Sequence, residues 1–124
     1  MDKEKKQYDH AFELKNAGKT EEAIALFKNI IKEYGESAVA NGMIANLYYI
    51  KLHDHVSALP YAKRAVELSP KSELASMALV LCLFEHNYKD EINNEIRRYL
   101  RVGKKIDLYK TLLRENGLNI EDFT

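Results

Sequence analysis

The chain has 124 residues, a hydrophobic content of 46%, and 19 basic side chains against 19 acidic ones. This length fits one domain with a single core, and the composition is typical of a folded, soluble globular protein. The zero net charge argues against nonspecific binding to nucleic acid or to a membrane surface as the main role. The single cysteine excludes an internal disulfide, and the opening MDKEKKQYDH lacks the apolar stretch of a signal peptide, so we expect a cytoplasmic location.

A first pair of helices is expected within residues 4–36. Residues 4–17 carry a loose apolar stripe at helical spacing, and Gly18 can end that helix in the left-handed conformation. Thr20 can cap the next helix, which has two acidic residues in its first turn. Apolar residues then recur at steps of three and four until Gly35, which indicates an amphipathic helix.

A second pair is expected within residues 37–71. Ser37 can cap its first helix, and the polar segment HDHVS at 53–57 separates the two helices, with an aspartate suited to capping the second. Pro60 is tolerated only near a first turn, so we expect the second helix to begin just before this proline.

A third pair is expected within residues 72–103, followed by a last helix at about 106–116. The third pair opens with the run MALVLCLF at 77–84, which periodicity alone cannot assign to a helix or a strand. Its apolar surroundings extend over 11 residues at 74–84, whereas a membrane-spanning helix needs about 20. We therefore expect no membrane span.

Similar positions recur along the chain. Ala23 and Ala58 are 35 residues apart, and Ala58 and Ile92 are 34 apart. A helix–turn–helix unit with this period predicts an all-α fold of the α-solenoid type, and it places the run MALVLCLF in the first helix of the third unit.

The chain resembles the tetratricopeptide repeat (TPR) family. The resemblance rests on Gly18, on EEAIALFKNII at 21–31, on Ala58 and Ala65, and on ELSP at 67–70. It implies one domain over 1–124 with three TPR-like repeats and a C-terminal capping helix. It also implies a concave groove, lined by the first helix of each repeat, that binds a peptide or a helix of another protein without catalysis.

The residues expected to face this groove are mostly apolar, and large exposed apolar surfaces usually mark interaction sites. The expected apolar contacts are Tyr8, Phe12, Met43, Ile44, Leu47, Ile50, Met77, Leu81 and Phe84. The charged residues expected to orient a partner are Asp9, Lys51 and Glu85.

Three covers for the apolar run stay open: the chain's own C-terminal segment, a second copy in a homodimer, or a partner protein. Accordingly, an adaptor that binds a helix or extended peptide in its groove is the first interpretation. A dedicated inhibitor, immunity or chaperone protein that masks one cognate protein is an alternative, and a self-associating structural module is another.

Residues suited to catalysis or metal binding are few. His53 and His55 could approach His86 and Asp90 at the turns between helices, but no cysteine completes a zinc site. Cys82 lies inside the apolar run and is expected to behave as a small hydrophobic residue. We expect no enzyme activity, no metal and no cofactor.

Basic residues gather between positions 97 and 114, interrupted only by Asp107. We expect a solvated helix face here, and a binding site for an acidic protein partner is the next interpretation. RNA comes after these two, because no aromatic residues form a stacking platform with the arginines. The basic residues are Arg97, Arg98, Arg101, Lys104, Lys105, Lys110 and Arg114.

Overall fold

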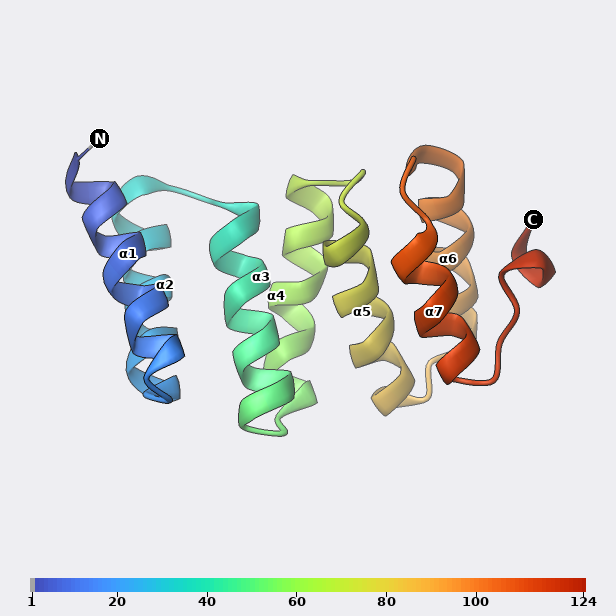
Figure 1. The fold of residues 1–124 in the computed structure, drawn as a ribbon, viewed down its shortest axis with the longest axis horizontal. Coiled ribbons are helices and arrows are strands. Elements are labelled where there is room, and N and C mark those ends of the chain that lie inside the picture. The colour runs from blue at the N-terminus through green and yellow to red at the C-terminus, as the bar shows by residue number, and fades with distance from the viewer. Residues whose placement is uncertain (1) are drawn as a thin grey trace.

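The computed structural model describes residues 2–124; Met1, the first residue of the predicted 1–124 domain, lies outside them. Within this range the chain forms seven α-helices and two short turns of other helical types, with no strand, so the all-α prediction is confirmed (Figure 1). The helices are α1 (Asp2–Asn16), α2 (Thr20–Tyr34), α3 (Ala38–Asn46), α4 (His55–Leu68), α5 (Glu73–His86), α6 (Lys89–Val102) and α7 (Asp107–Glu115). The short turns are the π turn η1 (Leu47–Lys51) and the 3-10 turn η2 (Ile120–Phe123).

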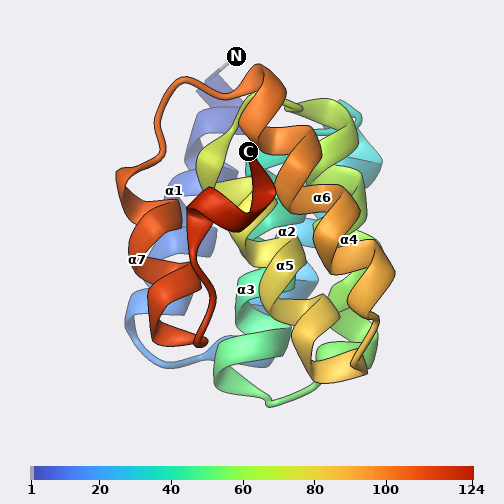
Figure 2. The same ribbon diagram turned by 90° about the vertical axis from the view of Figure 1, so that its right-hand side faces the viewer.

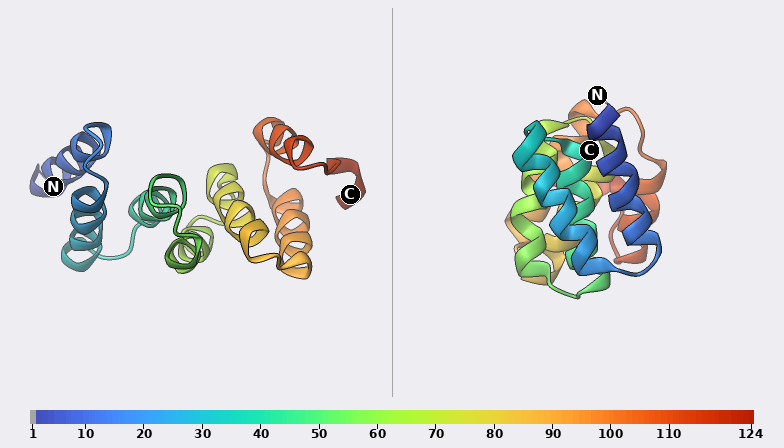
Figure 3. Two further views of the ribbon diagram at one scale, coloured as in Figure 1. Left: turned by 90° about the horizontal axis from the view of Figure 1, so that it is seen from below. Right: turned by 90° about the vertical axis from the view of Figure 1, so that its left-hand side faces the viewer.

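The helices pack sequentially in two layers. Helices next to each other along the chain contact each other from α1 to α6, and α7 packs against α5. The odd-numbered helices α1, α3, α5 and α7 form a front layer, and α2, α4 and α6 form a back layer (Figures 1 and 3). Seen from below, α1 and α7 stand forward of α3 and α5, so the front layer is curved with α3 and α5 at the inside of the curve (Figure 3).

Side-chain caps fix the starts of α3 and α5. The Ser37 hydroxyl accepts a hydrogen bond from the backbone N–H of Ala40 at 3.2 Å, as the sequence predicted. Ser72 does the same for α5, where the N–H of Ala75 donates at 3.1 Å. Thr20, by contrast, is the first residue of α2 and not its cap; Lys19 takes the capping position without a side-chain bond. Gly18, two residues after the end of α1, has a φ of 78°, which is the left-handed conformation expected there.

Helix α4 begins earlier than its proline predicted. Asp54 accepts a hydrogen bond from the N–H of Ser57 at 3.0 Å and starts the helix at His55, five residues before Pro60. Because Pro60 has no N–H, only one helical hydrogen bond is lost, and the carbonyl left without a donor is that of Val56, one turn earlier. Val56 lies at the exposed start of the helix, where water can replace that donor.

Two clusters of buried side chains fill the space between the layers. One joins α1, α2 and α3 around Phe27, and the other extends from α3 to α7 around Val80 and Ile96. Tyr48 and Tyr61, whose ring centroids are 6.1 Å apart, pack against both clusters. The two clusters therefore form one continuous core.

The apolar run at 77–84 lies in α5, so its assignment to a helix is confirmed. Helices α4, α6 and α7 all pack against α5. Leu79, Val80 and Leu83 are buried, as predicted. The remaining large side chains of the run are half-buried against the same core: Met77, Leu81 and Phe84.

The C-terminal segment covers one flank of α5. Tyr109, Leu112 and Leu113 of α7 are buried in the second cluster. The turn η2 then lies against α6 and α7 (Figure 2). The chain's own C-terminal segment is therefore one of the covers of the apolar helix.

Candidate functional site

The register of the front layer depends on one extra residue in the second helical pair. In the first pair the buried residues Ala11 and Ala23 are 12 positions apart, whereas Ala45 and Ala58 in the second pair are 13 apart. The π turn η1 accommodates the extra residue, because its hydrogen bonds span one residue more than those of an α-helix. The first helices are consequently spaced by 34 residues, although the second helices are spaced by 35.

Ile44 and Leu47 are corrections to the predicted contact set. Both were predicted from a spacing of 35 residues between the front-facing positions of α1 and those of α3. Because this spacing is 34 residues, both side chains point inward instead. Ile44 is 0% exposed and Leu47 is 2% exposed, so neither can contact a partner on this surface. The positions that take their place at the front of α3 are Met43 and Asn46, both half-buried.

The other predicted residues differ in how far they reach solvent. The hydroxyl of Tyr8 donates to Ser37 Oγ at 2.8 Å, and Phe12 packs edge-on against Phe27 with centroids 5.4 Å apart. These two half-buried rings therefore help to hold α1 in place. Four predicted residues are exposed: Asp9, Ile50, Lys51 and Glu85. Four are half-buried: Met43, Met77, Leu81 and Phe84.

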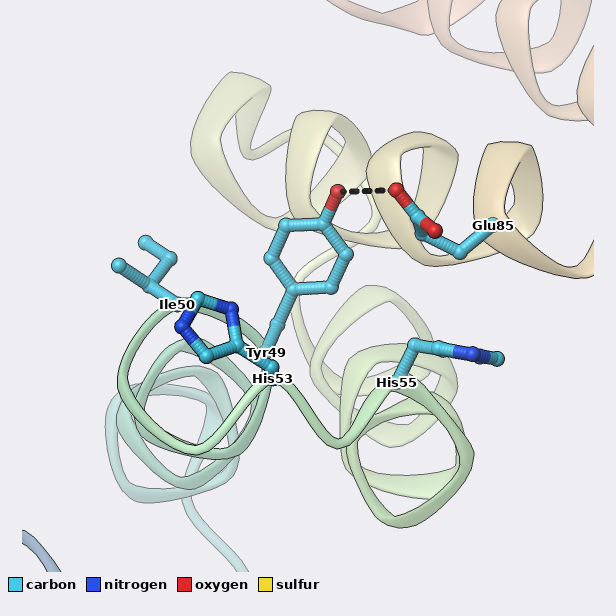
Figure 4. A pocket seen from close by; sticks show the side chains of 5 residues that line it. All are labelled: Tyr49, Ile50, His53, His55 and Glu85. Atoms are coloured by element: carbon cyan, nitrogen blue, oxygen red, sulfur yellow. Dashed lines mark hydrogen bonds between the residues drawn. The ribbon is translucent and has the colours of Figure 1, made fainter.

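A pocket of about 330 Å³ lies at one end of the front layer, where η1 meets the end of α5 (Figure 4). Ile50 and Glu85 line it together with Tyr49, His53 and His55. The Tyr49 hydroxyl donates to Glu85 Oε1 at 3.4 Å. Burial, and next the charge of Glu85, raise the pKa of the Tyr49 phenol, so it remains a protonated donor at neutral pH. The pocket could hold a small side chain of a partner.

The histidines beside this pocket contact one another. The rings of His55 and His86 lie perpendicular with centroids 4.6 Å apart, which confirms the predicted approach of these two residues. His86 Nδ1 donates to the carbonyl of Cys82 at 2.9 Å. Within residues 2–124, no three histidine, cysteine or carboxylate side chains come close enough together to hold a metal ion.

A second cavity, of about 540 Å³, opens at the other end of the front layer, between the starts of α5 and α7 and the end of α6. We call it the lysine-rimmed groove. Its apolar lining consists of Leu74, Val102, Leu108 and Tyr99. Its polar lining consists of Lys71, Lys104, Lys105, Ser72 and Glu73.

Six of the seven basic residues of 97–114 are exposed, as a solvated face requires, and only Arg98 is half-buried. Arg98 bonds to Glu95 through two nitrogens, at 2.7 and 2.6 Å, and also to the carbonyl of Pro70 at 2.8 Å. Arg97 lies over the ring of Phe123 at 5.8 Å. Lys104 and Lys105 are exposed on the rim of the lysine-rimmed groove.

Sequence reasoning missed three exposed aliphatic residues of the front layer: Val39, Leu74 and Leu108. A signal for the last of these is present, because Leu108 stands outside the stripe of apolar residues that predicts the buried side of its helix. An aliphatic residue outside such a stripe is a candidate contact.

Comparison with known family models and with curated proteins found no match for the chain. Among residues 2–124, no helix combines the length and the apolar character that crossing a membrane requires. We therefore infer function from the surface itself.

Proposed function

We propose that the chain is a noncatalytic protein-interaction module. Helices α1 to α6 would form three TPR-like repeats of an α-solenoid, and α7 would be the capping helix. The partner would dock a helix or an extended peptide against the front layer, since both modes use an apolar surface with a few orienting polar groups.

The distribution of exposed aliphatic residues carries this proposal. Among the described residues, five large aliphatic side chains are more than half exposed, and four of them lie on front-layer helices or on η1, which continues α3. These four are Val39 at 55%, Ile50 at 55%, Leu74 at 68% and Leu108 at 53%. The fifth is Val56, at 65%, on α4. Apolar side chains gathered on one layer are what a partner surface would require.

Cys82 and the Glu95–Arg98 pair support a noncatalytic role. Glu95 and Arg98 are paired with each other, and Glu95 also accepts a hydrogen bond from Ser76. Burial raises the pKa of the Cys82 thiol to about 11, so the thiolate that a nucleophile needs is not formed at neutral pH. The Cys82 thiol and the Glu95–Arg98 pair line neither of the two cavities described above.

The test uses peptides selected from a random library for binding to the intact chain. Their affinities are then measured for a variant carrying Val39→Glu and Leu74→Glu, and for a control variant carrying Val56→Glu. All three substitutions place a charge on an exposed aliphatic position, so each should leave the fold intact by circular dichroism.

We expect the double variant to lose about tenfold or more in affinity and the control to bind like the parent chain. Equal affinities for the parent and the double variant would place the binding surface outside the front layer and would overturn the proposal.

A further inference from the structure

The lysine-rimmed groove combines an open apolar floor with a cationic rim. Leu74 and Leu108 are more than half exposed, and Val102 is 39% exposed, although they come from three different helices. The structure brings them to one cavity of about 540 Å³, which is large enough to take at least one bulky side chain. Solvent-exposed aliphatic residues that converge in a recess favour a ligand with an apolar group.

The floor of this groove is held rigidly from below. The rings of Tyr99 and Tyr109 stack with centroids 5.0 Å apart, and both side chains are fully buried. The Tyr99 hydroxyl donates to the carbonyl of Lys105, which fixes the loop between α6 and α7. A groove that is already formed does not need to be ordered when a ligand binds, so less affinity is lost.

The rim carries a local excess of positive charge, although the whole chain has none. Lys71, Lys104 and Lys105 are exposed, and within the described residues none of them forms an ion pair. The one carboxylate in the lining, Glu73, is buried and accepts a hydrogen bond from the N–H of Tyr109 at 3.0 Å. The lysines are therefore free to pair with carboxylates from outside.

We propose that the lysine-rimmed groove binds an acidic amphipathic segment of a partner protein. An apolar side chain of that segment lies among Leu74, Val102 and Leu108, and carboxylates on both sides of it pair with Lys71, Lys104 and Lys105. This proposal rests on the proposed function and adds the chemistry of the partner.

Nucleic acid and anionic lipid are weaker occupants of the same groove. The aromatic residue in its lining, Tyr99, is fully buried and offers no face on which a base could stack. A bilayer surface is flat on this scale, whereas the apolar side chains converge on a recess.

The experiment titrates the intact chain with two amphipathic peptides of about 14 residues, roughly four helical turns. Both carry leucines at helical spacing; one has glutamates beside them, and the other has glutamines in their place. Each peptide is measured against the parent chain, against a variant carrying Lys71→Glu and Lys104→Glu, and against a control variant carrying Lys32→Glu, an exposed lysine of α2.

We expect the acidic peptide to bind at least about tenfold more tightly than the neutral one, and to lose that advantage in the double lysine variant or in high salt. The Lys32→Glu control should keep it. Equal binding of both peptides to the parent chain and to the lysine variant would overturn the proposed partner chemistry while the proposed function stands. Failure of both peptides, together with failure of the library selection, would overturn both. Binding to vesicles of anionic lipid or to single-stranded RNA, but not to the acidic peptide, would also overturn this inference.

Discussion

The carboxylate of Glu73, at the start of α5, accepts a hydrogen bond from the backbone N–H of Tyr109, in the first turn of α7, at 3.0 Å. This N–H is one of the donors that a helix start leaves without a partner inside the helix, so a residue of the third helical pair completes the cap of the last helix. The negative charge also lies where the helix dipole favours it. One bond therefore joins the apolar helix to its C-terminal cover.

Replacing Glu73 with alanine should destabilise the chain by about 1.5–3 kcal/mol, because a buried N–H loses a charged acceptor. Urea unfolding measures the change, and amide exchange at Tyr109 should speed up more than exchange in α2. Glu115→Ala, which changes an exposed glutamate of α7, serves as the matched control and should have little effect. A Glu73→Ala variant as stable as the parent chain would contradict this account of how α7 is held.

Replacing Glu95 with glutamine should also destabilise the chain, by about 2 kcal/mol, because Glu95 is buried and neutralises Arg98 through two hydrogen bonds. Glu91→Gln is the control on the same helix: this exposed carboxylate lies 3.8 Å from the amine of Lys63, and its loss should cost less than about 1 kcal/mol. Equal losses in the two variants, measured by thermal unfolding, would mean that the buried pair adds nothing to stability.

Replacing Gly103 and Gly42 with alanine should change the stability of the chain in opposite directions. A Cβ at Gly103 would overlap the ring of Tyr99, so Gly103→Ala should cost about 1–3 kcal/mol and loosen the loop beneath the lysine-rimmed groove. A Cβ at Gly42, inside α3, meets no atom within 4 Å, so Gly42→Ala should stabilise the helix by about 0.5–1 kcal/mol. Chemical denaturation of both variants checks the pair, and a stabilising Gly103→Ala would show that the ring of Tyr99 does not occupy this space.

The Cys82 thiol should react only when the chain unfolds. Burial, and next the charge of Glu85, raise the pKa of this thiol from 9.0 to about 11. The pKa of the thiol is higher in the folded state than in the unfolded state, so the folded chain holds this proton more tightly. The contribution of the thiol to the free energy of unfolding is therefore fully present below pH 9 and is lost as the pH rises toward 11. Iodoacetamide at pH 8 should therefore modify the chain slowly in buffer and quickly in denaturant.

The control for this prediction is Cys82→Ala, whose stability should fall less steeply over the same pH range. Some slope should remain, since burial also raises the pKa of Tyr49, Tyr99 and Tyr109. Rapid alkylation of the native chain, with its helical signal unchanged, would be incompatible with a buried Cys82.

Helix positions were predictable from the sequence because their signals are local. The three- and four-residue spacing of apolar side chains places α2, and the cap at Ser37 places α3. Even α5, which contains the apolar run, could be assigned to a helix, because the repeat period places it where the first helix of a repeat is expected. The cap at Asp54, by contrast, outweighed the constraint at Pro60, and α4 begins earlier than the proline alone predicts.

The candidate surface was less predictable because it depends on register. The second helices are spaced by 35 residues, but one extra residue in η1 reduces the spacing of the first helices to 34 and so changes which positions of α3 face the front. The sequence LYYIK gives no sign of this wider helical turn. Ile44 and Leu47 were therefore placed on the wrong side. The lysine-rimmed groove was missed for another reason: Leu74, Val102 and Leu108 come from three helices, and no local pattern says that they converge.

The most direct test of the interaction surface is a map of backbone amide shifts in isotope-labelled chain, titrated with the tightest peptide from the library. We expect the shifted amides to lie in the front layer, in α3, α5 and α7, and to include Val39, Met43 and Leu74. Shifts confined to the back-layer helices α2, α4 and α6 would contradict this expectation, as would the absence of any peptide that binds more tightly than about 100 μM.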